Sequence, residues 1–185
     1  MPDAPDEELM LAYAGGDAGA FDVIYARHKG PLFRLVLRSV KTRGEAEELF
    51  QDIWMRVVEA RERYVRTAKF TTWLYTVAHN RLIDHWRKKG LTIVAVENED
   101  GESVVEGKAG PFDEPHRIVE AKATLGRLDA ALAALPEAQR EAFLLHYEAD
   151  MTAAQIAEAT GTNEEAAKSR LRYAMDKLRK AVGDG

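Results

Sequence analysis

Two neighbouring segments combine an apolar stripe with a polar face whose groups could bind a macromolecule. Residues 44–64 read GEAEELFQDIWMRVVEARERY, and residues 69–89 read KFTTWLYTVAHNRLIDHWRKK. Together they contain all three tryptophans of the chain, Trp54, Trp73 and Trp86. Carboxylates dominate the polar face of the first segment, and hydroxyl, amide and basic groups that of the second. This combination indicates a protein-binding helix followed by a helix that contacts nucleic acid.

The first segment predicts an amphipathic helix with a carboxylate-rich outer face. Its apolar residues recur every three or four positions and form the expected core stripe, Leu49, Phe50, Ile53, Trp54, Val57 and Val58. The opposite side carries Glu45, Glu48, Asp52 and Arg56, with Gln51 nearby. This face is either a docking surface or an ordinary solvated surface with an Asp52–Arg56 pair worth roughly 0.3 kcal/mol.

The second segment predicts a helix with two distinct faces. The expected core arc consists of Phe70, Trp73, Leu74, Val77 and Ala78. The other arc gathers groups that can contact bases and phosphates, Thr72, Thr76, His79, Asn80, Ile83 and Arg87, with Lys88 and Lys89 beside it. Trp86 lies off both arcs, and we expect it to cover the core in preference to stacking on a base. We expect Arg81 to pair with Asp84 at the i+3 position.

The histidines do not predict a metal site. His79 and His85 are six positions apart, which places them about 120° apart around a helix, and His28 has no evident partner. Asp84 and His85 are adjacent, so they point apart and do not form an acid–base pair. We therefore expect no metal and no cofactor. A nucleic-acid enzyme is a weak alternative, because the chain lacks cysteine, a phosphate-binding glycine loop and a carboxylate metal cluster.

Residues 151–182 have the spacing of a helix-turn-helix. Ala154, Ile156 and Ala157 would pack the first helix, Gly161 would make the tight turn and Asn163 would cap the second helix. The second helix would bury Ala167 and Leu171 and direct the following groups outward: Lys168, Ser169, Arg170 and Arg172. Because the second helix of this motif lies in a major groove, the pattern predicts DNA binding. A helical hairpin with a basic face is the alternative.

Composition and charge agree with a nucleic-acid-binding protein whose basic surfaces are local. The chain has 185 residues and a net charge of −5. It contains no cysteine, which excludes disulfides and thiol chemistry. Its net charge is +6 over residues 56–89, −6 over 91–120 and +3 over 161–182. No apolar run reaches 18 residues, and the acidic N-terminus lacks a signal core. We expect a cytoplasmic protein without membrane insertion.

Helical periodicity runs from Asp6 to Lys89 and from about Asp113 to Val182, which predicts an all-α protein. We expect two small helical domains, residues 1–90 and 120–185, joined by a flexible acidic linker at 91–119. The linker contains the one β-like run, LTIVAV, which is too short for a sheet. The expected local signals are a cap at Asp17, a kink or break at Gly30-Pro31, a cap at Thr71 or Thr72, and Pro136 in the first turn of a helix.

With these motifs in this order, the chain resembles the extracytoplasmic-function (ECF) sigma factors, a class of bacterial transcription initiation factors. The segments that carry the resemblance are GDAGAFDVIYARHKGPLFRLVLR, AEELFQDIWMRVVEAR, FTTWLYTVAHNRLIDHWRK and LPEAQREAFLLHYEADMTAAQIAEATGTNEEAAKSRLRYAMDKLR. They cover nearly the whole chain. The resemblance implies a protein that binds core RNA polymerase and directs it to promoters with minus-ten and minus-thirty-five elements.

The resemblance also implies roles for individual residues. It places the contact with core polymerase, at the β′ coiled coil, on Glu48, Gln51, Asp52 and Arg56, with the β flap as a second polymerase contact. It places minus-ten recognition on Thr72, Thr76, His79, Asn80, Ile83, Arg87 and Lys88, with Asn80 near a flipped base. It places minus-thirty-five recognition on Asn163, Glu164, Glu165, Lys168, Ser169, Arg170 and Arg172.

The resemblance further implies promoter DNA and an anti-sigma factor as partners, and association with the nucleoid when the protein is part of the holoenzyme. We therefore expect an initiation factor and not an enzyme. The alternative is a helix-turn-helix repressor or activator that is not a polymerase subunit. That alternative explains the C-terminal module but leaves the carboxylate helix and the tryptophan-rich helix without a role.

Overall fold

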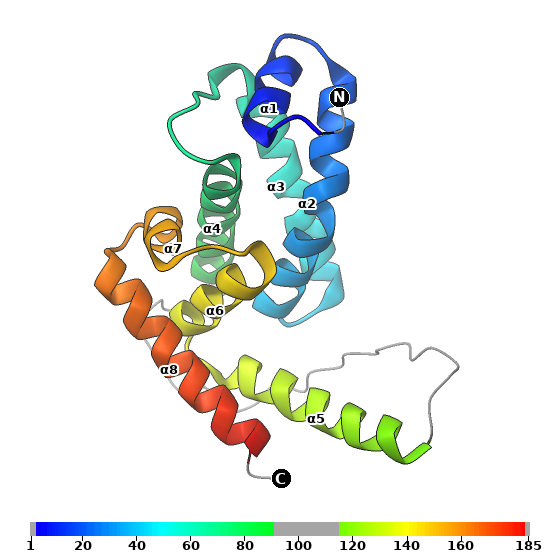
Figure 1. Cartoon of the computed structure of the whole chain (residues 1–185), viewed down its shortest axis with the longest axis vertical. Coiled ribbons are helices and arrows are strands. Elements are labelled where there is room, and N and C mark those ends of the chain that lie inside the picture. Colours follow the sequence, from blue (N-terminus) through cyan, green and yellow to red (C-terminus); the bar gives the residue numbers. More distant parts are fainter. Residues whose placement is uncertain (1–2, 91–114, 184–185) are drawn as a thin grey trace.

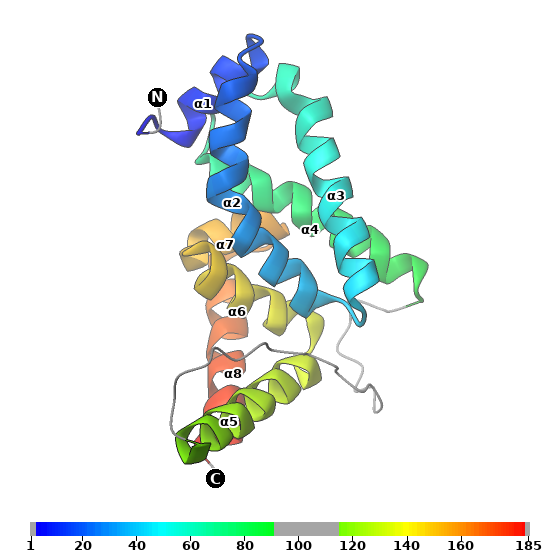
Figure 2. The same ribbon diagram turned by 90° about the vertical axis from the view of Figure 1, so that its right-hand side faces the viewer.

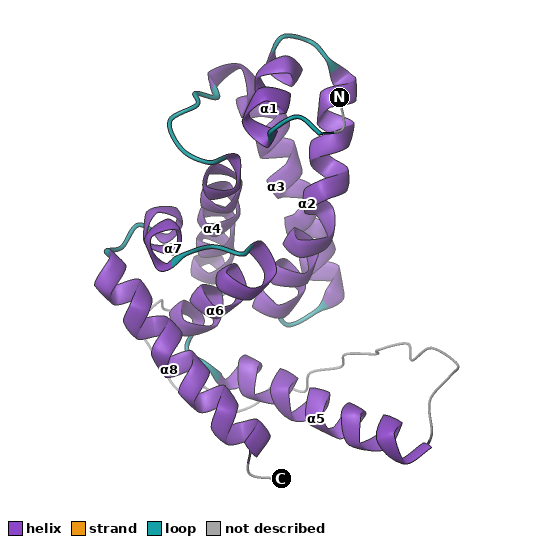
Figure 3. Cartoon of the chain, in the orientation of Figure 1, coloured by secondary structure: helices purple, strands orange, loops and turns teal. Residues whose placement is uncertain are grey.

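The computed structural model describes residues 3–90 and 115–183, and every regular element in these two ranges is a helix (Figure 3). The first range, here called the first unit, contains α1 (Asp6–Ala14), α2 (Ala18–Ser39), α3 (Arg43–Ala60), the short 3₁₀ helix η1 (Arg61–Arg63) and α4 (Phe70–Lys88). The second unit contains α5 (Pro115–Ala134), α6 (Glu137–Ala149), α7 (Ala153–Thr160) and α8 (Glu164–Gly183). The all-helical prediction is confirmed. The predicted linker and its β-like run lie outside the described residues as far as position 114, and α5 already begins at Pro115.

In the first unit, α1 packs on α2, α2 on α3 and α3 on α4. The predicted stripe of α3 supplies Leu49, Ile53, Trp54 and Val57 to the core, each at most 6% exposed. The predicted cap at Asp17 is confirmed, because its carboxylate accepts the Gly19 and Ala20 N–H groups at 3.0 and 3.4 Å. Local periodicity and capping thus define the bundle that presents α3 and α4.

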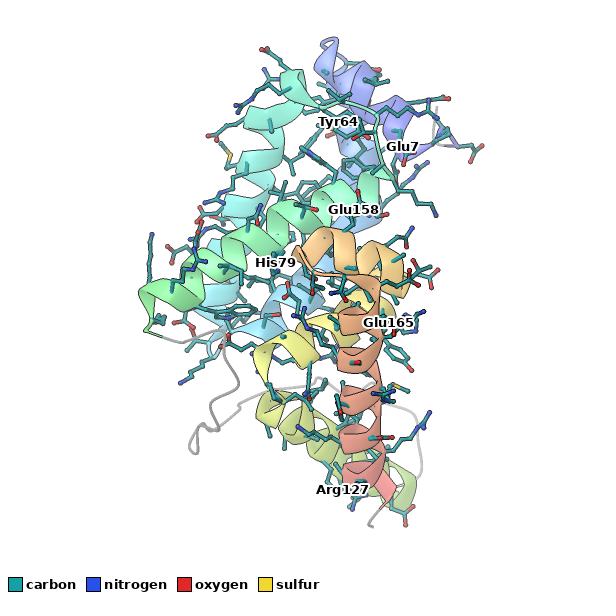
Figure 4. The ribbon with its side chains drawn as sticks, turned by 90° about the vertical axis from the view of Figure 1, so that its left-hand side faces the viewer. Glu7, Tyr64, His79, Arg127, Glu158 and Glu165 are labelled. Atoms are coloured by element: carbon teal, nitrogen blue, oxygen red, sulfur yellow. The ribbon has the colours of Figure 1, made fainter. Side chains whose placement is uncertain are left out.

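Two helix boundaries differ from the sequence prediction. Of the kink or break predicted at Gly30-Pro31, the break is absent, because α2 is a single helix with Pro31 inside it. Proline removes one backbone hydrogen bond, whereas Leu32, Leu35 and Val36 just after it are fully buried and hold the helix in the core. The start of α4 has no cap at Thr71 or Thr72. Instead, the Phe70 N–H donates to the Glu7 carboxylate of α1 at 2.7 Å (Figure 4).

The second unit ends in the predicted helix-turn-helix. Thr152 and Gln155 form a capping box at the start of α7, Gly161 adopts φ of +69° after its end, and Asn163 accepts the Ala166 N–H at 2.8 Å. Pro136 precedes α6 as its N-cap residue, one position ahead of the predicted first turn. The prediction that Ala154 packs inward is wrong, because it is exposed while Ile156 and Ala157 are buried.

The two units pack against each other. Helix α6 lies on α2 and α7 lies on α4, as the two views in Figures 1 and 2 show. Buried side chains from both units form one continuous hydrophobic cluster that extends from Leu9 to Ala167. No helix in the described parts of the chain combines the length and hydropathy required to cross a membrane.

Candidate protein and nucleic-acid interfaces

Helices α3 and α4 are connected by two ion pairs that differ from those predicted. Arg81 donates to Asp52 from Nε and Nη2 at 3.1 and 2.7 Å, and Arg56 donates to Asp84 at 3.4 Å. The predicted pairs within each helix, Asp52–Arg56 and Arg81–Asp84, are therefore wrong. Tertiary packing brings the opposite charges of two helices closer than those along one helix. The pairs border an open groove of about 550 Å³ lined by Asp52, Met55, Arg56, Glu59, Arg81, Asp84, Arg87 and Lys88.

The carboxylate face of α3 is accessible. Glu48 and Gln51 are exposed, and the side chains of Asp52 and Arg56 are 44% and 42% exposed. Glu45 is less accessible and receives the Lys89 ammonium at 2.6 Å, and this hydrogen bond lowers the pKa of the Glu45 carboxyl. The four residues expected to bind polymerase thus form one surface, and two of them, Asp52 and Arg56, also connect α3 to α4.

The polar arc of α4 is divided between an accessible and a covered part. Asn80, Arg87 and Lys88 are exposed and Ile83 is half-buried. Thr72 is only 3% exposed, and its backbone carbonyl accepts a hydrogen bond from the Thr76 hydroxyl at 2.7 Å. The expectation for Trp86 is confirmed, because it is 2% exposed and donates from Nε1 to the Ser39 carbonyl at 3.2 Å.

His79 of α4 contacts the second unit. The His79 Nδ1 lies 2.6 Å from Oε1 of Glu141, a residue of α6 that is only 5% exposed (Figure 4). The predicted minus-thirty-five residue Arg170 lies on the same side and lines a cavity of about 380 Å³ with His79, Asn80 and Ile83. Residues predicted to read two different promoter elements therefore line one partly open pocket.

The outer face of α8 and the residue before it, Asn163, contain the remaining predicted minus-thirty-five residues. Asn163, Glu164, Glu165, Lys168 and Arg172 are exposed, and Ser169 is half-buried. Lys168 pairs with Glu164 at 3.2 Å and with Glu165 at 3.6 Å. The hydrogen bond that Lys168 donates to Glu164 and the charges of both glutamates raise the pKa of Lys168. The glutamates thus neutralise part of the basic charge at the start of this helix.

Sequence reasoning missed a second group of charged residues. Glu148 of α6 accepts from Arg34 Nε and from Arg38 Nη1 of α2, both at 2.7 Å. Arg38 also lies 3.8 Å from Asp129 of α5. The partners are 110 or more positions apart for Glu148 and 62 apart for Glu141–His79. No local spacing rule connects such distant residues.

Two of the histidines pair with carboxylates of the protein. His28 lies 2.8 Å from Asp6, and His79 is engaged by Glu141. Among residues 3–90 and 115–183, no three His, Cys, Asp or Glu side chains are grouped so that they could hold a metal ion. The chemistry that these surfaces offer is recognition through hydrogen bonds and charge.

Comparison with known families gives two separate matches along the chain. Residues 24–92 match the model of sigma-70 region 2, and residues 125–178 match that of sigma-70 region 4. The ECF RNA polymerase sigma factor RpoE of Cereibacter sphaeroides is 30% identical over 166 residues, which cover 88% of this chain and 86% of that protein. SigK of Mycolicibacterium vanbaalenii, also an ECF RNA polymerase sigma factor, is 29% identical over 184 residues, with 96% and 89% covered.

Two solved structures have a similar fold. CnrH, in complex with the cytosolic domain of CnrY, matches with a TM-score of 0.69 and 20% identity over 97% of both chains. The sigma factor RpoE of Bartonella quintana, in complex with the anti-sigma factor NepR, matches with a TM-score of 0.70 and 21% identity. That match covers 88% of this chain and 96% of the solved one.

Proposed function

The chain belongs to the ECF sigma factors of the sigma-70 family, and from this premise we propose how its surfaces divide the steps of transcription initiation. As a member of that family it directs RNA polymerase to promoters and is not an enzyme. The observation that carries the assignment is the ordered match to regions 2 and 4 on a fold that ends in a capped helix-turn-helix.

The polymerase-binding surface in this proposal is the outer face of α3. Glu48 and Gln51 are exposed, and Asp52 and Arg56 are oriented by their bonds to α4. We assign this face to the β′ coiled coil and expect the second unit to contact the β flap. The hydrogen bonds from Arg81 to Asp52 also support the packing of α3 on α4, so a substitution of Asp52 would affect both the fold and polymerase binding. Glu48 is therefore the better residue for testing the polymerase contact.

Promoter recognition in this proposal is divided between α4 and α8. On α4, Asn80, Ile83, Arg87 and Lys88 are accessible for the minus-ten element, whereas Thr72 is buried, Thr76 is half-buried and His79 is bound by Glu141 of the second unit. On α8, the candidates for the minus-thirty-five element are Asn163, Glu164, Glu165, Lys168, Ser169, Arg170 and Arg172. The exposed amide and basic groups fit base-edge and phosphate contacts, respectively.

The proposal also includes a regulatory partner and a location. The solved RpoE of Bartonella quintana is bound to an anti-sigma factor, and we propose that an anti-sigma factor likewise binds this chain. We place the protein in the cytoplasm, where bacterial RNA polymerase acts, and on the nucleoid when it is part of the holoenzyme. Neither proposal requires a cofactor.

The test of the function is run-off transcription with bacterial core polymerase on a library of promoter fragments, with and without this protein. We expect new, protein-dependent start sites that share two spaced sequence elements. A folded protein that neither binds core polymerase nor supports any transcript would contradict the proposal. Tight polymerase-independent binding to a palindromic site would favour a helix-turn-helix repressor or activator instead.

The polymerase contact is tested with Glu48→Arg. Reversal of an exposed charge should leave the fold intact and weaken core binding by at least tenfold, because truncating or reversing a hot-spot charge typically costs about 2 kcal/mol or more. The matched control is Asp22→Arg, an exposed carboxylate on α2 outside the proposed face. If fluorescence anisotropy gives the two variants equal affinity for core polymerase, the outer face of α3 is not part of the polymerase interface.

A further inference from the structure

Helix α4, which carries the proposed minus-ten residues, begins without a cap of its own. Lys69 stands at the N-cap position, its side chain accepts no hydrogen bond, and the first turn contains no acidic residue. The first N–H groups of a helix have no partner within that helix, so they need an acceptor from elsewhere. Glu7 of α1 supplies one, because its Oε1 accepts the Phe70 N–H at 2.7 Å. A residue 63 positions away thus takes the part that a local serine or aspartate usually has.

The segment that leads into α4 is fixed at both ends and exposed between them. Tyr64 and Phe70 are 6% and 0% exposed, and their rings lie 5.2 and 5.8 Å from that of Trp73. Of the five residues between them, all but Ala68 are exposed. Figure 4 shows Glu7 beside Tyr64 at this end of the first unit. The Glu7 hydrogen bond therefore adds a polar attachment to apolar packing, at the point where an exposed segment becomes a helix.

Helix α1 is a firm base for this attachment. Asp6, the residue before Glu7, receives Arg27 of α2 at 2.7 Å and lies 2.8 Å from His28. The same helix buries Leu9 and Met10. A carboxylate at the start of a helix is also favoured by the helix dipole. Two consecutive carboxylates of α1 thus connect α2 on one side with the start of α4 on the other.

We propose that Glu7 is a positioning residue for promoter opening, which fixes the start of α4 and contacts neither DNA nor polymerase. Asn80 lies ten residues beyond Phe70, or about 15 Å along the helix. Because a helix moves as a rod, a loose start displaces the amide that is proposed to meet a base. The proposal rests on the proposed function for its consequence in transcription, whereas the cap is a property of the free chain.

The cap is tested on the free protein by amide hydrogen exchange, followed by NMR. Glu7→Ala should speed exchange of the Phe70 amide by roughly tenfold or more, because that amide loses its acceptor. Glu7→Gln keeps a side-chain oxygen and should retain most of the protection. Unchanged exchange at Phe70 in Glu7→Ala would overturn the cap.

The positioning role is tested with two variants that each remove one helix cap from the first unit. Glu7→Ala removes that of α4, and Asp17→Ala removes that of α2. Each should lower the melting temperature by about 2–4 °C. Only Glu7→Ala should reduce open complexes in permanganate footprinting, by about fivefold, which is part of the cost of losing the Asn80 contact.

Affinity for core polymerase should be the same in both variants and in the unaltered protein. An equal loss of open complexes in Glu7→Ala and Asp17→Ala would mean that Glu7 acts through stability alone, and would overturn the positioning role. A loss of core affinity in Glu7→Ala that matches its loss of open complexes would overturn it as well, because Glu7 would then serve polymerase binding.

A cap placed within α4 separates the position of the helix from the presence of Glu7. In Glu7→Ala, adding Lys69→Ser puts a hydroxyl at the N-cap position, where it can accept an N–H of the first turn. This double variant should open promoters as well as Lys69→Ser alone, which accounts for the lost lysine charge. Opening that stays about fivefold lower would overturn the role of the cap. If the unaltered protein forms no open complex, the proposed function fails and the positioning role with it, whereas amide exchange still decides the cap.

Discussion

Asp6 shows how one carboxylate holds the start of the first unit. It receives Arg27 Nη1 at 2.7 Å and lies 2.8 Å from His28 Nε2. Burial alone would raise the pKa of Asp6, but hydrogen bonds and charge from His28 and Arg27 outweigh burial and lower it. A lowered pKa in the folded state means that ionised Asp6 contributes stability above its ordinary pKa. This stability is lost as the pH falls through the lowered value.

Asp6→Asn should therefore lower the free energy of unfolding at pH 7 by about 1–2 kcal/mol, because it removes charge-assisted hydrogen bonds. The difference from the unaltered protein should shrink as the pH falls below about 4, because Asp6 takes up a proton in the unfolded chain at a higher pH than in the folded protein. Urea unfolding between pH 3 and 7 measures both quantities. Asp22→Asn, an exposed carboxylate on α2, is the control and should have no effect. A constant difference across this pH range would contradict the assignment.

Substitutions of Asn80 and Lys88 should impair promoter binding and opening differently, because Asn80 offers an amide for a base and Lys88 a charge for phosphate. Both are exposed on α4, so neither substitution by alanine should disturb the core. Asn80→Ala should reduce open-complex formation by about tenfold, since contacts to an unstacked base are worth roughly 1–3 kcal/mol, and should affect the closed complex less. Lys88→Ala should weaken both complexes alike. Permanganate footprinting and filter binding distinguish the two steps; equal loss of both in Asn80→Ala would count against base capture.

At the scale of elements, the sequence predicted what local rules decide. Apolar spacing placed the core stripe of α3, and capping chemistry placed Asp17, Gly161 and Asn163 at helix ends. The choice between a kinked and a broken α2 could not be made from the sequence, because it depends on the tertiary burial of residues around Pro31. The start of α4 depends on Glu7, which is 63 positions away in the sequence.

The same distinction explains the candidate sites. The composition of the α3 and α4 faces follows from periodicity, so their polar residues were identifiable in advance. Which of those residues are accessible depends on contacts between helices that are distant in sequence. Asp52 pairs across to Arg81, and His79 is covered by Glu141. Ion-pair partners and accessibility are therefore tertiary properties.

The turn between α7 and α8 has a backbone requirement that can be measured by itself. Gly161 has φ of +69°, and a Cβ added there would meet no atom within 4 Å. Gly161→Ala should consequently cost about 1 kcal/mol through left-handed backbone strain alone, or about 2–4 °C in melting temperature. Gly161→Asn should cost less, because asparagine tolerates this conformation. Calorimetry of the three proteins checks this order, and an alanine variant at least as stable as the asparagine variant would contradict it.

At the scale of the whole molecule, attachment of the units combines two forces that respond differently to salt. The continuous apolar cluster is insensitive to screening, whereas the Arg34 and Arg38 side chains that meet Glu148 are 52% and 39% exposed. Raising ionic strength from 0.1 to 1 M shortens the screening length from about 10 to about 3 Å. Salt should thus weaken the charged part of the attachment and leave the apolar part.

Salt should therefore change the distance between the units in opposite directions in the unaltered chain and in Glu148→Arg. In the otherwise unaltered chain, salt screens attraction between Glu148 and two arginines. Distances between spin labels on Val65→Cys and Asp176→Cys, measured by double electron–electron resonance, should therefore lengthen between about 0.1 and 1 M NaCl. In Glu148→Arg, salt screens repulsion among three cations, so the distances should shorten over the same range. A charge-swapped variant, with Arg34→Glu, Arg38→Glu and Glu148→Arg, should follow the unaltered chain, because its charges again attract. A response of the same sign in all three would mean that the apolar cluster alone determines how the units are held.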